Sequence, residues 1–215
     1  MWVPSKDSTE VPGTMSGHPE ETTVLVVDDE PDVADLYAYR LGDSYDVRVA
    51  NDGETALDEL DESVDVVLLD RRMPGLSGDE VLTTLREANY DCRVIMVTAV
   101  DPDVDIVDMA FDDYVCKPVG QEELLAAVEQ QLTAKRYSDS VQALFRATSK
   151  MGVLRAERSL DDLENTEEYQ RLEARIEELR AKNTELLDEL DDFEAAFNAI
   201  DPTPPDGGQP EEVHL

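Results

Sequence analysis

The sequence is poor in positive charge. It contains 52 Asp and Glu residues but only 18 Lys and Arg residues, so its formal net charge is −34. The acids are spread along the whole chain rather than gathered in one tail. In dilute buffer such a surface would repel nucleic acid and the chain itself, and concentrated salt would screen that repulsion. We therefore infer a halophilic protein that loses its fold at low salt.

Cysteines and long apolar runs are also scarce. Cys92 and Cys116 lie in or beside apolar runs and form no disulfide framework, which fits a reducing cytoplasm. No apolar run approaches the ~18 residues that a membrane span needs. Residues 1–21 lack the apolar core of a signal peptide, so we expect a flexible polar arm there. These absences predict a soluble, cytoplasmic protein.

What the sequence does contain, from Thr23 onward, is a regular alternation of short apolar runs and helical patterns. The helical patterns include one at 121–132 and a weak one at 104–109. Five apolar runs predict strands, at residues 23–27, 47–50, 64–69, 94–97 and 114–116. Such an alternation predicts a doubly wound α/β fold, with a five-stranded parallel sheet and helices on both faces. No Gly-x-Gly-x-x-Gly motif and no Gly-Lys-Ser/Thr loop supports a nucleotide site.

Polar residues follow four of the predicted strands. They are Asp28 and Asp29 after the first, Asp70 after the third, Thr98 after the fourth and Lys117 after the fifth. Because the ligand crevice of an open parallel sheet lies beyond the carboxyl ends of its strands, we expect these side chains to meet. Three carboxylates in one crevice call for a divalent cation, and oxygen ligands with room for water suit Mg²⁺. The sequence therefore predicts a site for phosphoryl transfer onto a carboxylate, with the hydroxyl and the ammonium binding the phosphoryl oxygens.

Four motifs in this order resemble the receiver domain of two-component response regulators. They are Asp-Asp after the first strand, Asp-x-x-Met-Pro-Gly from Asp70, Thr-Ala from Thr98 and Asp-Asp-Tyr-x-x-Lys-Pro from Asp112. The resemblance covers roughly Thr23 to Lys135. It implies that Asp70 accepts a phosphoryl group from the phosphohistidine of a histidine kinase.

The resemblance also assigns the metal ligands. Asp29 and Asp70 would bind Mg²⁺ directly, together with the backbone carbonyl of Arg72, and Asp28 would act through water. An alternative of another class is a hydrolase that forms an aspartyl-phosphate. Such an enzyme would usually need a second acid two residues after the nucleophile, where Arg72 stands. We therefore expect no enzyme beyond self-catalysed phosphorylation and dephosphorylation.

Thr98 and Tyr114 match the switch pair of the receiver family, in which the hydroxyl moves toward the phosphate and the aromatic ring turns inward. Tyr114 could equally be a packed strand aromatic. The resemblance further implies a cis peptide bond before Pro118.

The second half of the chain is predicted to be helical. We expect the receiver domain at 22–137, a helical output segment at 138–201 and a disordered tail at 202–215. Ser138 or Asp139 can cap a new helix at the start of the output segment. The output segment, with Ala-Thr-Ser-Lys from Ala147 and Glu-Tyr-x-x-Leu-Glu after it, resembles the HalX domain of haloarchaeal response regulators.

From Thr166 onward the apolar residues follow a heptad pattern. Position d holds Leu172, Leu179, Leu186, Phe193 and Ile200, and position a holds Tyr169, Ile176, Asn183, Leu190 and Phe197. A single polar residue at a, Asn183, specifies a parallel, in-register dimer. We therefore favour a homodimeric coiled coil through residues 166–200. Like charges would face each other in that dimer, and the alternative is an antiparallel hairpin against residues 139–158.

The predicted function is that of a phosphorelay response regulator whose phosphorylated Asp70 switches the helical output segment. The family suggests transcriptional control. The acidity of the second half and the lack of a helix-turn-helix signature favour instead a protein–protein adaptor with no output directed to DNA.

Overall fold

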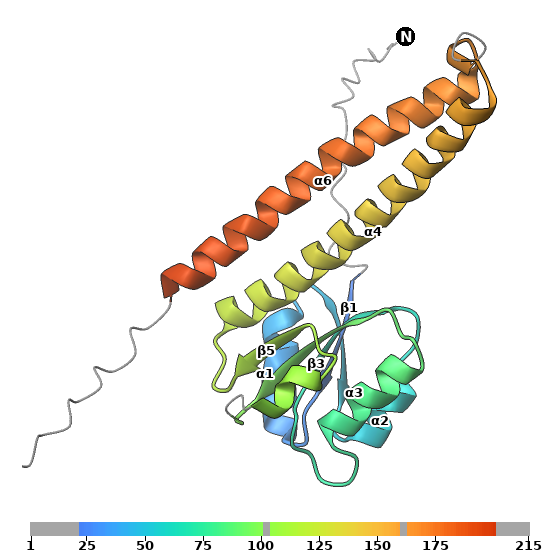
Figure 1. Cartoon of the computed structure of the whole chain (residues 1–215). Coiled ribbons are helices and arrows are strands. Elements are labelled where there is room, and N and C mark those ends of the chain that lie inside the picture. The colour runs from blue at the N-terminus through green and yellow to red at the C-terminus, as the bar shows by residue number, and fades with distance from the viewer. Residues whose placement is uncertain (1–21, 101–103, 160–162, 201–215) are drawn as a thin grey trace, which may run out of the picture.

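The chain folds into a five-stranded sheet with helices on both faces and two long helices that extend beyond it (Figure 1). The computed structural model describes residues 22–100, 104–159 and 163–200, and the side chains of 104–105 and 194–200 are not described. The predicted N-terminal arm (1–21) and the C-terminal tail (202–215) lie outside these residues. The elements run β1 Thr23–Val27, α1 Pro31–Leu41, β2 Asp46–Ala50, α2 Gly53–Glu59, β3 Val64–Leu69, α3 Gly78–Glu87, β4 Arg93–Thr98, η2 Val104–Asp108, β5 Asp113–Cys116, α4 Gln121–Glu157 and α6 Glu167–Ile200.

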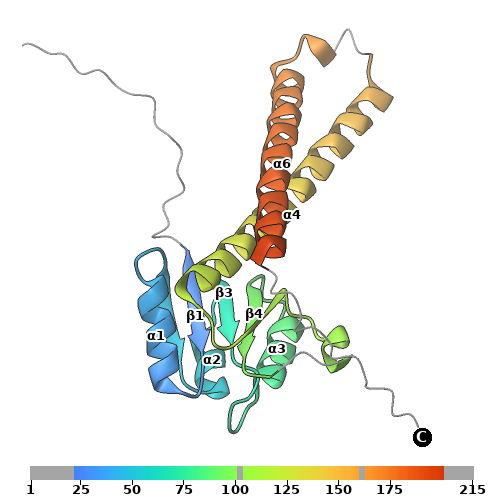
Figure 2. The same cartoon turned by 90° about the vertical axis from the view of Figure 1, so that its left-hand side faces the viewer.

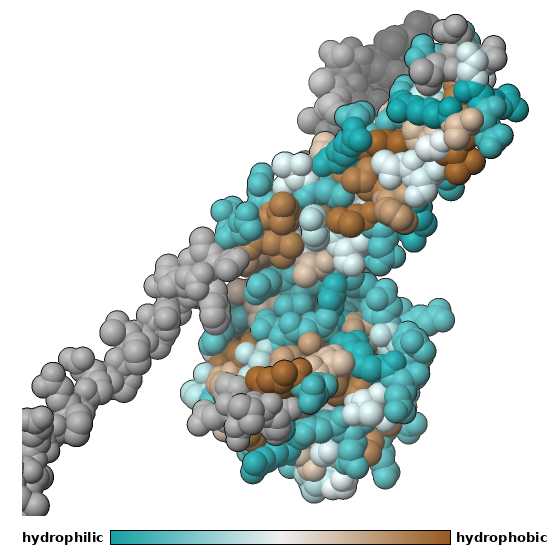
Figure 3. Space-filling model, in the orientation of Figure 1, coloured by the Kyte–Doolittle hydropathy of each residue, from teal (hydrophilic) through white to brown (hydrophobic). Residues whose placement is uncertain are grey.

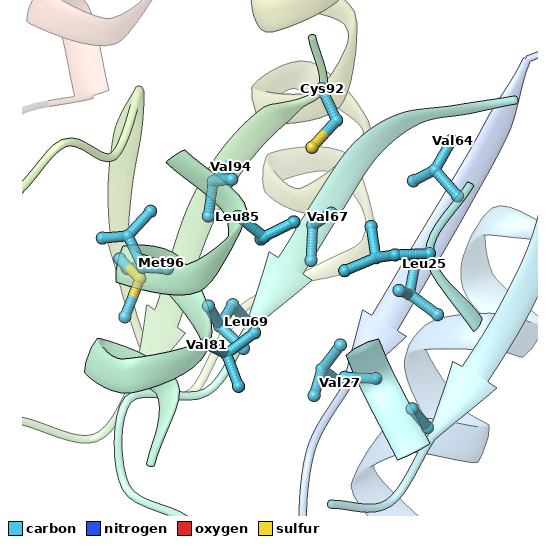
Figure 4. Packing of buried hydrophobic residues seen from close by; sticks show 14 of the residues in the cluster. Leu25, Val27, Val64, Val67, Leu69, Val81, Leu85, Cys92, Val94 and Met96 are labelled. Atoms are coloured by element: carbon cyan, nitrogen blue, oxygen red, sulfur yellow. The ribbon is translucent and has the colours of Figure 1, made fainter. Parts of the chain in front are cut away.

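The sheet confirms the predicted fold. Its strands are all parallel, in the order β2-β1-β3-β4-β5, so the connection from β1 out to β2 and back to β3 places β1 and β3 side by side at the centre. Because consecutive residues of a strand point to opposite faces, each apolar strand contributes to two cores. One core lies against α2 and α3 and contains Leu25, Val67 and Leu69 (Figure 4). The other lies against α1 and α4 and contains Val24 and Leu68.

Local signals in the sequence determine where the helices begin. Pro31 occupies the first turn of α1, where its missing N–H would have had no partner. The Asp52 side chain caps α2 by accepting from the Thr55 amide at 2.7 Å. Ser77 and Glu80 form a reciprocal capping box at the start of α3. These caps fix the loops that leave the carboxyl ends of the strands.

The helix predicted at 121–132 and the helix predicted to start at Ser138 or Asp139 form one continuous helix. A single helix, α4, runs unbroken over 37 residues and crosses the position between 137 and 138. The predicted helix start at Ser138 or Asp139 is therefore wrong. No Pro or Gly interrupts the sequence between Gln121 and Met151, and adding a residue to an existing helix is cheaper than nucleating a new one. The predicted helix at 104–109 is also different, since η2 is a 3₁₀ helix.

The helix α6 packs back against α4 in an antiparallel hairpin (Figures 1 and 2). Arg155 near the end of α4 donates to the Tyr169 hydroxyl at 2.8 Å, and Arg136 lies 3.9 Å from Glu189 at the other end. We call residues 138–157 of α4 together with α6 the helix pair. Within the described part of the chain, no helix is long and apolar enough to cross a bilayer.

Part of the predicted heptad face of α6 is thus covered within one chain, and the side chains of Phe197 and Ile200 lie outside the described residues. Tyr169, Ile176, Leu179 and Leu186 are all at most 5% exposed, and Tyr169, Ile176 and Leu179 share a core with Ala147 and Met151 of α4. This arrangement is the hairpin alternative. The coiled-coil dimer through residues 166–200 is not confirmed, since forming it would require α6 to leave α4.

Candidate functional site

Two acids are held side by side where β1 and β3 end. The register pairs Val27 with Leu69, so Asp28 and Asp70 leave neighbouring strands at the same level. The Asp70 amide donates to the Val27 carbonyl at 2.9 Å, which continues the ladder by one residue. Both side chains belong to buried residues, with Asp28 2% and Asp70 7% exposed. Buried carboxylates require a compensating partner.

Lys117 provides that partner. Its Nζ lies 2.6 Å from Oδ2 of Asp28 and 2.6 Å from Oδ2 of Asp70. Its own amide donates to the Thr98 carbonyl at 2.8 Å, which holds the end of β5 against β4. Burial lowers the pKa of Lys117, but the hydrogen bonds and charges of the two carboxylates outweigh burial and raise it above its ordinary value. Lys117 is therefore an ammonium ion between two carboxylates.

The acids also fit a divalent cation. Asp28, Asp29 and Asp70 each offer a carboxylate oxygen, and these oxygens lie within 4.8 Å of one another. One ion with oxygen ligands can span such a cluster, and Mg²⁺ prefers one or two carboxylates plus waters. Arg72 lies beside the cluster, since its amide donates to Oδ1 of Asp70 at 3.2 Å. That its carbonyl binds the metal stays a prediction.

The two predicted switch residues meet at a common residue. Thr98 is 1% exposed at the end of β4, and its Oγ1 accepts from the Val100 amide at 3.4 Å. The Tyr114 hydroxyl donates to the Val100 carbonyl at 2.6 Å. The Tyr114 ring also lies 5.6 Å from that of Phe111. Val100 therefore links the hydroxyl and the ring, a contact that no local pattern in the sequence signals. The Lys117–Pro118 peptide bond is cis, as predicted.

Gly78, the first residue of α3, also supports the site. Its amide donates to the Arg71 carbonyl at 3.0 Å. A Cβ added to Gly78 would lie 2.1 Å from the backbone oxygen of Asp70, closer than any real contact. Only glycine lets α3 begin this close to the backbone of Asp70. The signal that could have found it is a Gly immediately after the Ser that caps a helix.

Comparisons with known proteins divide the chain into two matched regions. Residues 24–129 match the family described as response regulator receiver domain, and residues 133–199 match the HalX domain. A Haloferax volcanii protein described as "Putative transcriptional regulator" is 45% identical over 164 residues, which are 76% of this chain. The chain spans only 28% of that relative's length.

Two solved structures share the fold of the first region. A signal receiver domain from Vibrio parahaemolyticus is 26% identical with a TM-score of 0.52, and the match covers 56% of this chain and 97% of that domain. A receiver domain protein from Methanospirillum hungatei is 23% identical with a TM-score of 0.50, and the match covers 54% of this chain and 96% of that one. The chain therefore belongs to the response regulators in which a receiver domain is followed by a HalX domain.

Proposed function

We propose that Asp70 accepts a phosphoryl group from the phosphohistidine of a histidine kinase, and that this phosphorylation switches the helix pair. The observation that carries the proposal is the ammonium of Lys117 2.6 Å from Asp70, in a cluster with Asp28 and Asp29. A carboxylate so placed can act as a nucleophile toward phosphorus, because the groups around it offset the charge of an incoming phosphoryl group.

The reaction moves one phosphoryl group. An Asp70 oxygen forms a bond to phosphorus while the bond from phosphorus to the histidine nitrogen breaks, and that nitrogen keeps the electron pair. Asp29, Asp70 and the Arg72 carbonyl would hold Mg²⁺ directly and Asp28 through water, and the ion would neutralise charge on the phosphoryl oxygens. Lys117 would exchange part of its contact with Asp70 for a phosphoryl oxygen. The Thr98 hydroxyl would donate to another, and rotation of the side chain toward that oxygen would release the Val100 amide.

Release of Val100 offers a route to the output. The Tyr114 hydroxyl donates to the carbonyl of that same residue, so a shift of Val100 would change the hydrogen bond that holds the Tyr114 ring in place. Next to Tyr114, Asp113 contacts Gln131 of α4 at 3.5 Å. Because α4 continues without a break into the helix pair, a displacement of β5 reaches the output through one rigid element.

The two remaining functional hypotheses differ in whether the helix pair acts on DNA or on a protein. Transcriptional regulation is supported by the description of the Haloferax relative, of which this chain matches a minor part. A protein–protein adaptor is supported by the charge of α6, which carries 11 acids and four cations and would repel the phosphates of DNA. We favour protein partners for α6. The hydrolase alternative is disfavoured by Arg72, which stands where a second acid would be needed.

Phosphorylation can be tested directly. The chain is incubated with acetyl phosphate and Mg²⁺ in concentrated KCl, and its intact mass is measured. We expect an adduct of one phosphoryl group that Asp70→Asn abolishes and Asp58→Asn, an exposed acid on α2, leaves unchanged. Omission of Mg²⁺ should also abolish it. An adduct that survives Asp70→Asn, or no adduct on the wild-type chain, would overturn the proposal.

A further inference from the structure

One face of α4 in the helix pair carries no charge at all. It points away from α6 and consists of Val141, Phe145, Thr148, Gly152 and Ala156, at intervals of four, three, four and four residues. Phe145 is 72% and Val141 40% exposed, both high for apolar side chains of their size. Figure 3 shows apolar side chains along the visible side of the helix pair, whereas the visible side of the receiver is mostly hydrophilic with smaller apolar patches. We call these five residues the outer face of α4.

The polar side chain on this face, Thr148, already has hydrogen-bond partners within its own helix. The Thr148 hydroxyl donates to backbone carbonyls of its own helix, those of Leu144 at 2.8 Å and Phe145 at 3.0 Å. Its methyl group is what remains for a neighbouring molecule. At Gly152 an added Cβ would meet nothing within 4 Å, so the helix is open there. The outer face is therefore large at its N-terminal end and small at its C-terminal end.

The distribution of charge favours a second copy of this chain as the partner. The chain has a net charge of −34, so most surfaces of two copies repel each other. Residues 140–156 are the exception, because they contain Arg146, Lys150 and Arg155 and no acid. Arg146 lies beside the outer face, whereas Lys150 lies on the other side of the helix and Arg155 pairs with Tyr169 and Glu173 of its own α6. Two copies that approach through α4 thus meet at the one long acid-free stretch of the described helices.

We propose that the outer face of α4 is the surface through which two copies of this chain associate, with their α4 helices antiparallel. Across a two-fold axis between Thr148 and Ser149, Phe145 of one copy covers Gly152 of the other. Val141 covers Ala156, and Thr148 lies against Ser149. Every large side chain then meets a small one twice, as an isologous interface requires. Each α4 contributes a stretch of roughly 22 Å, and α6 stays on its own α4.

This interface differs from the parallel coiled coil that the heptad pattern suggested. The coiled coil uses the Tyr169–Leu186 face of α6, which is buried against α4. The antiparallel interface uses a face that the hairpin leaves exposed, and it forms in the unphosphorylated chain. It does not rest on the proposed phosphorylation of Asp70.

The test is the mass of the full chain by light scattering over a concentration series in concentrated KCl. We expect a dimer that Phe145→Glu converts to a monomer, because the added charge would be buried against Gly152. Val153→Glu is the matched control: Val153 is 64% exposed but lies roughly 100° around the helix from Gly152. It should leave the dimer intact. Circular dichroism verifies that each variant keeps its helices.

The register has its own test. Gly152→Phe alone should weaken the dimer, because two Phe side chains would meet at each contact, and Phe145→Ala combined with Gly152→Phe should restore it. A wild-type monomer at every concentration, a dimer that survives Phe145→Glu, or equal loss with Val153→Glu would overturn the proposed surface. Failure of the double variant to restore the dimer would overturn the antiparallel register.

Discussion

The receiver domain and the helix pair achieve burial in different ways. In the receiver, a parallel sheet is covered on both faces, and residues 66–69 of β3 are all 0% exposed. In the helix pair, a single core fills the space between two helices, and its buried members are 1–8% exposed. One part is a closed three-layer structure, and the other is a two-layer structure with an open back.

Polar groups follow the same division. Among the described residues, the buried side-chain atoms without a hydrogen-bond partner are Ser140 Oγ and Asn183 Oδ1, and both lie in the helix pair. The buried carboxylates of Asp28 and Asp70 in the receiver are instead paired with the part-buried ammonium of Lys117. An unsatisfied buried polar atom costs about 1–3 kcal/mol. The polar groups of the receiver are therefore satisfied at its site, whereas the helix pair contains unsatisfied polar atoms whose removal would stabilise it, and it leaves one face exposed.

Removal of salt should produce the largest difference in stability between the two regions. Residues 185–194 contain six acids and no cation, including the like-charged i,i+4 pairs Glu185–Glu189 and Asp188–Asp192. As screening falls, α6 should detach first and the receiver unfold at lower salt. Hydrogen exchange of peptides from α6 and β3, measured along a KCl series, tests this order. A melting temperature independent of salt, or simultaneous loss of both regions, would contradict it.

Truncation of one leucine in each region gives the next largest difference. Leu68→Ala should destabilise the receiver by about 4 kcal/mol, since its surroundings are packed on both sides and cannot close on the cavity. Leu179→Ala should cost about 2 kcal/mol, because α6 can move toward α4. Denaturant unfolding followed separately for each region measures both. Equal costs would show that the helix pair is as tightly packed as the sheet.

A glycine-to-alanine substitution should have opposite signs in the two regions. Gly78→Ala places a Cβ against the Asp70 backbone oxygen and should destabilise the receiver by about 3 kcal/mol. Gly152→Ala meets open space in a helix and should stabilise the helix pair by about 1 kcal/mol. Both are measured by denaturant unfolding at protein concentrations where the chain is monomeric. Destabilisation by Gly152→Ala would mean that the helix is constrained there.

The same comparison explains what the sequence could predict. In the receiver, strand ends carry both the apolar pattern and the polar residues, and a parallel sheet brings those ends to one edge whatever the details. Asp28, Asp70, Thr98 and Lys117 were therefore placed together from the sequence. The contact of Gly78 with Asp70, and the link through Val100, depend on exact loop paths that no local pattern encodes.

The arrangement of the helix pair was harder to predict, because the pattern of an apolar helix face does not indicate which surface it packs against. The heptad pattern of α6 fits a second copy and α4 equally well, and the difference lies in long-range packing. The predicted break near Ser138 failed for a related reason: a residue that can cap a helix can also sit inside one when nothing else interrupts it.

Asn183 offers the smallest and most discriminating change. In the hairpin its Oδ1 is buried without a partner, so Asn183→Leu should stabilise the helix pair by about 1 kcal/mol and leave the oligomeric state unchanged. In the parallel coiled coil, Asn183 would pair with Asn183 of the second chain and favour a two-stranded assembly. The same substitution should then yield larger, mixed oligomers. Thr184→Leu, on the exposed side of α6, corrects for the higher helix propensity of Leu. Denaturant unfolding gives the stability and light scattering gives the mass. A gain in stability with an unchanged mass supports the hairpin. A change in mass with Asn183→Leu but not with Thr184→Leu would show that this face of α6 packs against a second copy and not against its own α4.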